Sequence, residues 1–158
     1  MTTEAAQIIL EKARARGVTV TCAESCTGGM VAAALTDVAG SSQIFERGFV
    51  TYSNRAKTEM LGVPEPVLQA HGAVSEPVAQ HMAKGALDAA GADVAVSITG
   101  IAGPGGSAVK PEGRVCFGLA TALGTSTETV DFGALGRARV RQKATAYALH
   151  LLISALIE

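Results

Sequence analysis

The chain has 158 residues, of which 48% are hydrophobic and 17% are charged, and its formal net charge is −1. A chain of this length can bury most of its apolar surface in one core, so we expect residues 1–158 to form a single domain. The small net charge argues against a nucleic-acid partner and against a membrane surface, and the apolar runs are too short to span a bilayer.

Cysteine usage and the first residues indicate the cellular compartment. The chain has an odd number of cysteines without regular spacing, Cys22, Cys26 and Cys116, which argues against a disulfide framework. The first residues show no basic segment followed by an apolar stretch, so we expect no signal peptide. We therefore expect a cytoplasmic protein. A dimer is the commonest assembly of small cytosolic enzymes, so we expect a homo-oligomer, a dimer.

The histidines do not indicate a metal site. His71, His81 and His150 are scattered, and no His or Cys pair near Cys22 and Cys26 has the spacing of metal ligands. We therefore expect no metal and no other cofactor.

The predicted elements alternate between strands and helices. In chain order they are helix 3–16, strand 18–23, helix 29–38, strand 48–53, a helix capped by Asn54 that ends at Gly62, a helix opened by Ser75, strand 93–99, a loop over 100–113, a hairpin of strands 114–122 and 126–132 joined near Gly124, and helix 137–157. Pro64 and Pro66 forbid continuation of the helix that ends at Gly62.

This alternation predicts an α/β fold in which helices cover both faces of a mostly parallel sheet. The two hairpin strands are joined too closely for a crossover, so they pair antiparallel. We therefore expect a mixed sheet of about five strands.

Three loops are expected to converge at one edge of this sheet. Ligands of open α/β sheets bind outside the carboxyl ends of the parallel strands. The segments after the first three predicted strands are 24–29, 54–57 and 100–106. Ser25, Lys57 and Thr99, which lie at or beside these ends, can then be neighbours.

The turn after the first strand suits either a nucleophile or an anion cradle, because its backbone N–H groups lie at a helix N-terminus. Ser25 is a nucleophile only if it has a base, and Lys57 is the candidate at a strand end. The amine must then be neutral, through burial or a nearby cation such as Arg55 or Arg141. The backbone N–H groups of residues 26–29 are candidates for an oxyanion hole.

Each candidate also has a plain structural interpretation. Ser25 can be a helix cap, Lys57 a solvated surface residue, and Tyr52 a packing residue that does not orient a substrate. Residues 100–106 form either an anion-binding nest or a flexible loop. Cys26 is a rival nucleophile, because a cysteine at a helix N-terminus has a lowered pKa, with Glu24 and Lys57 as helpers.

Several motifs carry a resemblance to a known family. They are the segments 23–29 (AESCTGG), 40–42 (GSS), 45–48 (FERG), 50–54 (VTYSN), 56–57 (AK), 71–76 (HGAVSE) and 97–106 (SITGIAGPGG). With these motifs in this order, nearly the whole chain resembles the CinA C-terminal domain family. The stand-alone members of that family include the PncC-type nicotinamide-nucleotide amidases.

The resemblance implies a three-layer α/β/α fold and hydrolysis of the carboxamide of nicotinamide mononucleotide to nicotinate mononucleotide and ammonia. It implies a serine–lysine mechanism in which Ser25 is the nucleophile, Lys57 the general base and Tyr52 an assisting residue. The expected substrate-binding residues are Cys26, Thr27, Gly28, Gly29, Thr99, Gly100, Gly103, Gly105 and Arg141. Arg141 and the 99–106 loop are the candidates for the substrate phosphate. A non-catalytic binding module, as in some fused relatives, is the alternative from another functional class.

Overall fold

The computed structural model describes residues 2–157. Its helices and strands are α1 (Thr2–Arg16), β1 (Val20–Glu24), α2 (Met30–Thr36), the short 3-10 helix η1 (Ser41–Gln43), β2 (Phe49–Val50), α3 (Asn54–Leu61), α4 (Glu65–His71), α5 (Glu76–Ala90), β3 (Val94–Gly100), β4 (Arg114–Thr121), β5 (Gly124–Asp131) and α6 (Arg137–Leu156).

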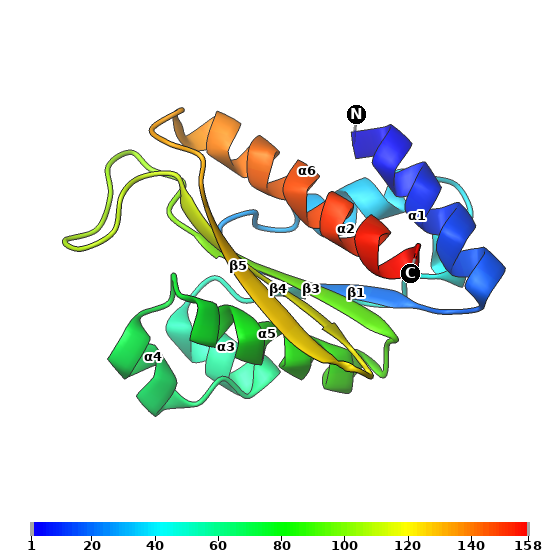
Figure 1. The fold of residues 1–158 in the computed structure, drawn as a ribbon, viewed down its shortest axis with the longest axis horizontal. Helices are drawn as coiled ribbons and strands as arrows, with labels where there is room; N and C mark the ends of the chain where they lie inside the picture. The colour runs from blue at the N-terminus through cyan, green and yellow to red at the C-terminus, as the bar shows by residue number, and fades with distance from the viewer. Residues whose placement is uncertain (1, 158) are drawn as a thin grey trace.

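Within the described residues, five strands form one mixed sheet in the order β2-β1-β3-β4-β5. β1 pairs in parallel with β2 and β3, whereas β4 pairs antiparallel with β3 and β5. Helices α1, α2 and α6 cover one face of this sheet, and α3, α4 and α5 cover the other (Figure 1). The predicted α/β fold with a mixed sheet and helices on both faces is thus confirmed.

Each face of the sheet has its own apolar cluster, because the sheet side chains alternate between the two helical layers. One cluster joins α1, α2 and α6 to the sheet through residues such as Ile9, Leu35 and Leu152. The other joins α3, α4 and α5 through residues such as Leu61 and Met82. Among residues 2–157, no helix has both the length and the apolar character needed to cross a membrane.

The structure corrects several expected boundaries. The strand predicted over 48–53 is only two residues long, and the helix predicted over 29–38 begins at Met30 and ends at Thr36. The cap of α3 is Ser53, whose hydroxyl accepts from the N–H of Ala56 at 3.0 Å, so the predicted cap Asn54 is wrong.

A helix that the sequence analysis did not predict, α4, follows the α3 terminus. Pro66 lies in its first turn, where the missing N–H of a proline costs no hydrogen bond. The turn between β4 and β5 is tighter than expected, because Thr121 pairs directly with Gly124 and the glycine belongs to the strand.

The sheet register brings the carboxyl ends of the parallel strands together. Glu24, the last residue of β1, pairs with Val50 of β2 on one side and with Ile98 of β3 on the other. The chain leaves β1 for one neighbour and returns on the opposite side, which makes this edge the topological switch point where ligands bind in open α/β sheets. The β3–β4 loop projects beyond the sheet near the N-terminal end of α6 (Figure 1).

Candidate functional site

Ser25 lies directly after β1, in the turn that leads to α2. Its backbone N–H donates to the Ile98 carbonyl of β3 at 2.9 Å, and its carbonyl accepts from the N–H of Gly28 at 3.1 Å. These bonds hold the turn against the neighbouring strand. The Ser25 residue is 7% exposed, so its hydroxyl lies below the surface without being sealed from it.

Lys57 reaches the same place from the first turns of α3. Its Nζ lies 2.9 Å from the Ser25 Oγ, and it donates to the backbone carbonyls of Thr51 at 3.0 Å and Tyr52 at 3.2 Å. The sequence separation between Ser25 and Lys57 is 32 residues, so only the sheet topology makes them neighbours.

These contacts determine what a neutral lysine can do. A backbone carbonyl only accepts, and a neutral amine has two N–H donors and one lone pair. When both N–H groups donate to Thr51 and Tyr52, the lone pair remains for the hydroxyl proton of Ser25. The amine is therefore placed to accept that proton and, once protonated, to donate it again.

Burial makes the neutral form of Lys57 accessible. The residue is 1% exposed, and this burial lowers its pKa from 10.5 to about 8, while the neighbouring Cys26 thiol acts in the opposite direction to a smaller extent. At pH 7 about a tenth of such lysines are neutral, compared with about one in 3,000 at the ordinary pKa. The site thus increases the amount of free base by roughly 300-fold.

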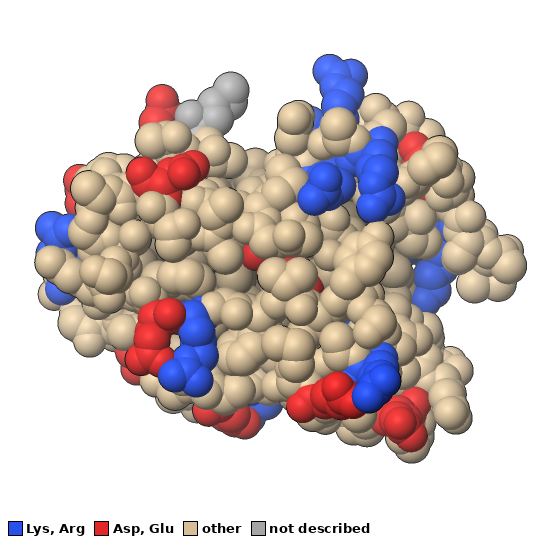
Figure 2. Space-filling model, turned by 180° about the vertical axis from the view of Figure 1, so that it is seen from behind, with Lys and Arg blue, Asp and Glu red and all other residues tan. Residues whose placement is uncertain are grey.

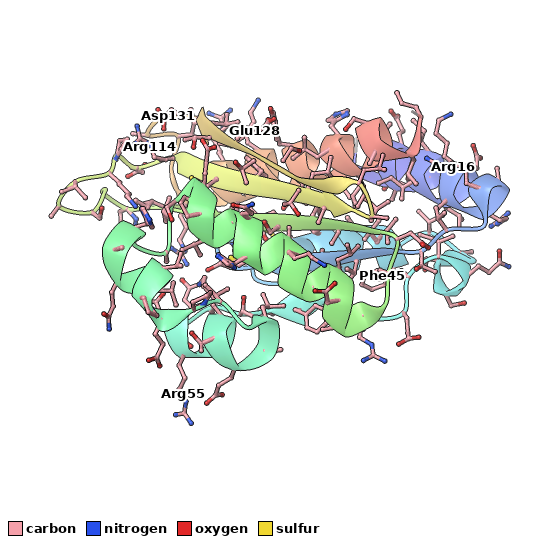
Figure 3. All side chains as sticks on the ribbon, turned by 60° about the horizontal axis from the view of Figure 1, so that its bottom comes forward. Arg16, Phe45, Arg55, Arg114, Glu128 and Asp131 are labelled. Carbon is pink, nitrogen blue, oxygen red and sulfur yellow. The ribbon has the colours of Figure 1, made fainter. Side chains whose placement is uncertain are left out.

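The expected cationic neighbours do not cause this shift in the Lys57 pKa. Arg55 donates to Glu59 at 2.7 Å and points into solvent, away from the body of the protein (Figure 3). Arg141 is engaged with backbone carbonyls, as described below, and burial is the cause of the lowered pKa.

A buried carboxylate organises the turn around Ser25. Glu24 is fully buried, and its Oε1 accepts from the Thr27 hydroxyl at 2.6 Å and from the N–H groups of Gly29 at 3.1 Å and Val31 at 3.0 Å. Its Oε2 accepts from the N–H of Ala32 at 3.0 Å. The carboxylate thereby satisfies the free N–H groups at the α2 N-terminus, where a negative charge is favourable.

These bonds reduce the number of backbone N–H groups that can donate to an oxyanion. The N–H of Gly28 donates to Ser25, and that of Gly29 donates to Glu24. No other residue among 2–157 accepts from the backbone N–H groups of Cys26 and Thr27. Of the four expected donors, these two are therefore the ones available to a developing oxyanion.

A cavity of about 320 Å³ opens over the Ser25–Lys57 pair. It is lined by Ser25, Cys26, Tyr52, Lys57, Ala73, Val74, Thr99, Gly100, Ile101, Ala102, Gly103, Pro104, Gly105 and Arg137. The three loops expected to converge all contribute to this wall. Of the expected substrate-binding residues, Thr27, Gly28, Gly29 and Arg141 lie outside the lining.

The side chain of Tyr52 is at the rim of the cavity. It is 62% exposed, and its hydroxyl accepts from Arg137 Nη2 at 3.1 Å. Only its backbone carbonyl contacts Lys57, at 3.2 Å. Tyr52 is thus positioned to contact a substrate in the cavity, and its phenol makes no hydrogen bond to Ser25 or Lys57 in the described chain.

The loop after β3 forms one wall of the cavity. The Thr99 hydroxyl donates to the Ala73 carbonyl at 2.9 Å, which fixes this wall to the loop before α5. The N–H of Gly105 donates to Glu112 at 2.6 Å, so a carboxylate of the chain itself already uses one donor of the expected anion-binding nest.

Arg141 supports the Ser25 turn from the side of α6. Its Nε donates to the Cys26 carbonyl at 3.0 Å, and its Nη2 donates to the Thr27 carbonyl at 3.3 Å. Both carbonyls belong to the residues whose N–H groups are free. Arg141 therefore contacts the turn itself and lies outside the lining of the cavity.

The thiol of Cys26 lacks the activation expected of a nucleophile. Burial raises its pKa to about 11, which outweighs the nearby positive charges of Arg141 and Lys57. The lowered pKa expected for this cysteine is wrong, because burial dominates; α2 itself begins only at Met30, four positions further along the chain. Cys22 and Cys116 are also free and buried, and burial raises the pKa of both thiols.

Two parts of the site were not predicted from the sequence. Arg137 lines the cavity, but four basic residues crowd the start of α6 and nothing in their spacing separates it from Arg141. Ala73 and Val74 carry no side-chain chemistry and enter the wall through the loop before α5. Among residues 2–157, no three His, Cys, Asp or Glu side chains gather as metal ligands would.

Comparison with known proteins identifies close relatives of this chain. The model of the CinA C-terminal domain family matches residues 2–156. The nicotinamide-nucleotide amidohydrolase PncC of Escherichia coli K12 is 61% identical over 140 residues, which cover 88% of this chain and 85% of the relative. The PncC of Enterobacter agglomerans is 54% identical over 146 residues, which cover 92% and 89% of the two chains.

Solved structures show the same fold. The competence/damage inducible protein CihA of Agrobacterium tumefaciens superimposes with a TM-score of 0.95 at 45% identity, covering 99% of this chain and 96% of the other. A competence damage-inducible protein A of Klebsiella pneumoniae gives a TM-score of 0.95 at 40% identity, covering 99% and 98%.

Proposed function

Since the chain belongs to the CinA C-terminal domain family, we propose that it hydrolyses the carboxamide of nicotinamide mononucleotide to nicotinate mononucleotide and ammonia. One observation carries the proposal. The Lys57 Nζ lies 2.9 Å from the Ser25 Oγ on the floor of a cavity, in a chain 61% identical to a nicotinamide-nucleotide amidohydrolase. The proposed catalytic unit is the single domain formed by residues 1–158.

In the proposed mechanism, neutral Lys57 accepts the hydroxyl proton of Ser25 while the Ser25 Oγ attacks the carboxamide carbon. The free N–H groups of Cys26 and Thr27 stabilise the oxyanion, a contribution of about 3–4 kcal/mol for one such donor. The protonated Lys57 then donates to the departing nitrogen, the C–N bond breaks, and ammonia leaves. An ester between the substrate acyl group and Ser25 remains.

Water completes the cycle. Lys57, neutral again after the release of ammonia, accepts a proton from a water molecule that attacks the ester carbon. The Ser25 oxygen leaves and recovers its proton from Lys57, which releases nicotinate mononucleotide. The same lysine thus acts as base and acid in both halves, which fits a pKa near 8.

Ammonia release from nicotinamide mononucleotide tests the activity, and paired variants test the nucleophile. We expect Ser25→Ala to lower kcat by at least about 1,000-fold, and Cys26→Ala to retain turnover within about tenfold, since its contribution is a backbone N–H. Loss of turnover only in Cys26→Ala would assign the chemistry to the cysteine. A wild-type protein that binds the nucleotide and releases no ammonia would be a binding module.

Compartment and assembly are part of the same proposal. The free, buried cysteines fit a reducing compartment, and we propose a cytoplasmic enzyme. We propose a homodimer on the general frequency of dimers among small enzymes. Light scattering of the purified protein distinguishes a dimer of twice 16.0 kDa from a monomer.

A further inference from the structure

Among residues 2–157, the side chains that can bring a charge to the cavity lining are all basic. Among its lining residues the ionisable cations are Lys57 and Arg137, and no Asp or Glu belongs to the lining. Lys57 acts as the base in the proposed reaction and also donates to two backbone carbonyls, so it is not available to bind a charged group of the substrate. Arg137 is therefore the cation of this wall that remains for a charged group of a substrate.

Lys57 and Arg137 lie at different depths in the cavity. Ser25 and Lys57 are buried, whereas Arg137 and its partner Tyr52 are exposed. A substrate that reaches Ser25 with its neutral carboxamide thus presents its other end to the rim. The arrangement suits a molecule with an uncharged reacting group at one end and an anion at the other.

The contacts of Arg137 orient its guanidinium at that rim. Its Nη1 donates to the Gly103 carbonyl at 2.8 Å, and its Nη2 donates to the Tyr52 hydroxyl at 3.1 Å. A guanidinium has five N–H donors, so three remain free after these two bonds. The planar guanidinium of Arg137 matches the oxygens of a phosphate. Because its two hydrogen bonds already hold it in place, it loses little conformational entropy when it binds one.

The surroundings of Arg137 add to this preference for an anion. α6 begins at Arg137 and has no acidic residue in its first turn, and its N-cap, Gly136, offers no side-chain acceptor. Lys and Arg side chains gather at this end of the helix in the space-filling view (Figure 2). Arg141, one turn further on, is occupied by the Cys26 and Thr27 carbonyls.

We propose that Arg137 binds the 5′-phosphate of the substrate and makes the enzyme select a nucleotide over the nucleoside that lacks this group. The inference rests on the proposed amidase activity, and it moves the phosphate contact from Arg141 and the 99–106 loop to the rim of the cavity.

Two substrates and two variants test it. Ammonia release is measured with nicotinamide mononucleotide and with nicotinamide riboside, its analogue without phosphate, for the wild type, Arg137→Ala and Arg139→Ala. Arg139 is exposed on the same helical turn and does not line the cavity, so Arg139→Ala controls for the loss of one charge. Thermal unfolding checks that all three proteins fold.

We expect Arg137→Ala to lower kcat/KM for the nucleotide by about 10- to 100-fold, mainly through KM, and to leave the riboside within about threefold. Arg139→Ala should change either substrate by less than about threefold. An equal loss of kcat/KM for the nucleotide and the riboside in Arg137→Ala overturns the proposal. A loss for the nucleotide in Arg139→Ala as large as that in Arg137→Ala overturns it as well.

Binding measurements keep the two proposals separable. If the wild type releases no ammonia, the amidase proposal fails, and calorimetric titration with the same two compounds still tests Arg137. Tighter binding of the nucleotide than of the riboside by the wild type, lost in Arg137→Ala, supports the phosphate contact. Equal nucleotide affinity in the wild type and in Arg137→Ala overturns it.

Discussion

At the scale of single residues, the site depends on a lysine whose charge the fold disfavours. Lys57 is among the largest fully buried side chains, and its pKa is lowered by burial. The sequence indicated that Lys57 lies at a strand end, but a lysine in an exposed first turn of a helix has the same sequence pattern. Only its burial beneath the loops distinguishes a base from a surface residue.

The pH dependence of activity follows from this pKa. Burial lowers the Lys57 pKa to about 8, so the neutral base is the minor form below that value and the major form above it. We expect kcat/KM for nicotinamide mononucleotide to rise about tenfold per pH unit below pH 8 and to level off above it. Initial rates between about pH 6 and pH 9.5 measure the profile. A flat profile, or one that falls through this range, would exclude Lys57 as the base.

At the scale of elements, short-range chemistry decides how each segment begins and ends. β2 pairs over only two residues, because the chain leaves the sheet at Thr51. The Thr51 N–H still donates to the Glu24 carbonyl of β1, but the Thr51 carbonyl accepts from Lys57. A prediction of strand from residues 48–53 misses this departure, since β-branched and aromatic residues favour a strand whether or not a partner is present.

The α2 N-terminus depends on the carboxylate of Glu24. Glu24→Gln replaces one acceptor oxygen by an NH₂ group that faces backbone donors, so we expect a loss of about 2–4 kcal/mol in the free energy of unfolding. Urea unfolding measures this loss. Glu59→Gln, at an exposed pair with Arg55, should cost less than about 0.5 kcal/mol. Equal effects of the two changes would contradict the capping role.

Gly85 allows α3 and α5 to approach closely. A Cβ built on Gly85 would lie 2.0 Å from the Leu61 carbonyl oxygen at the end of α3. Gly85→Ala should therefore destabilise the protein by about 2 kcal/mol, although alanine is the better helix former by about 1 kcal/mol.

Thermal unfolding of Gly85→Ala measures this prediction. Ala89→Gly, on the exposed side of the same helix, reports the propensity effect alone and should cost about 1 kcal/mol. Since α3 also carries Lys57, we expect Gly85→Ala to slow turnover. A variant as stable as the wild type would show that the helices separate without cost.

At the scale of the whole molecule, charged side chains are distributed unevenly even though the net charge is small. The net charge of −1 offers no long-range attraction for an anionic nucleotide, but basic side chains gather at the α6 N-terminal end (Figure 2), and Arg137 among them lines the cavity. Substrate attraction is therefore local, between an exposed guanidinium and a phosphate, and salt screens such contacts.

We accordingly expect the KM for nicotinamide mononucleotide to rise about threefold between about 0.05 and 0.5 M salt, while kcat changes little. Nicotinamide riboside, which has no phosphate, should show no such rise. Steady-state kinetics at several salt concentrations check this. A fall in kcat with constant KM would contradict a screened contact at the rim.

The alternation of strands and helices, the mixed sheet, and the edge at which Ser25, Lys57 and Thr99 meet could all be predicted from the sequence. These follow from local patterns and from the rule that parallel strands share their carboxyl edge. Three features could be seen only in the folded protein. They are the burial that lowers the Lys57 pKa, the available N–H groups of Cys26 and Thr27, and the presence of Arg137 rather than Arg141 in the cavity wall. Solvent exclusion and the direction of a side chain depend on distant segments, so spacing along the chain does not contain them.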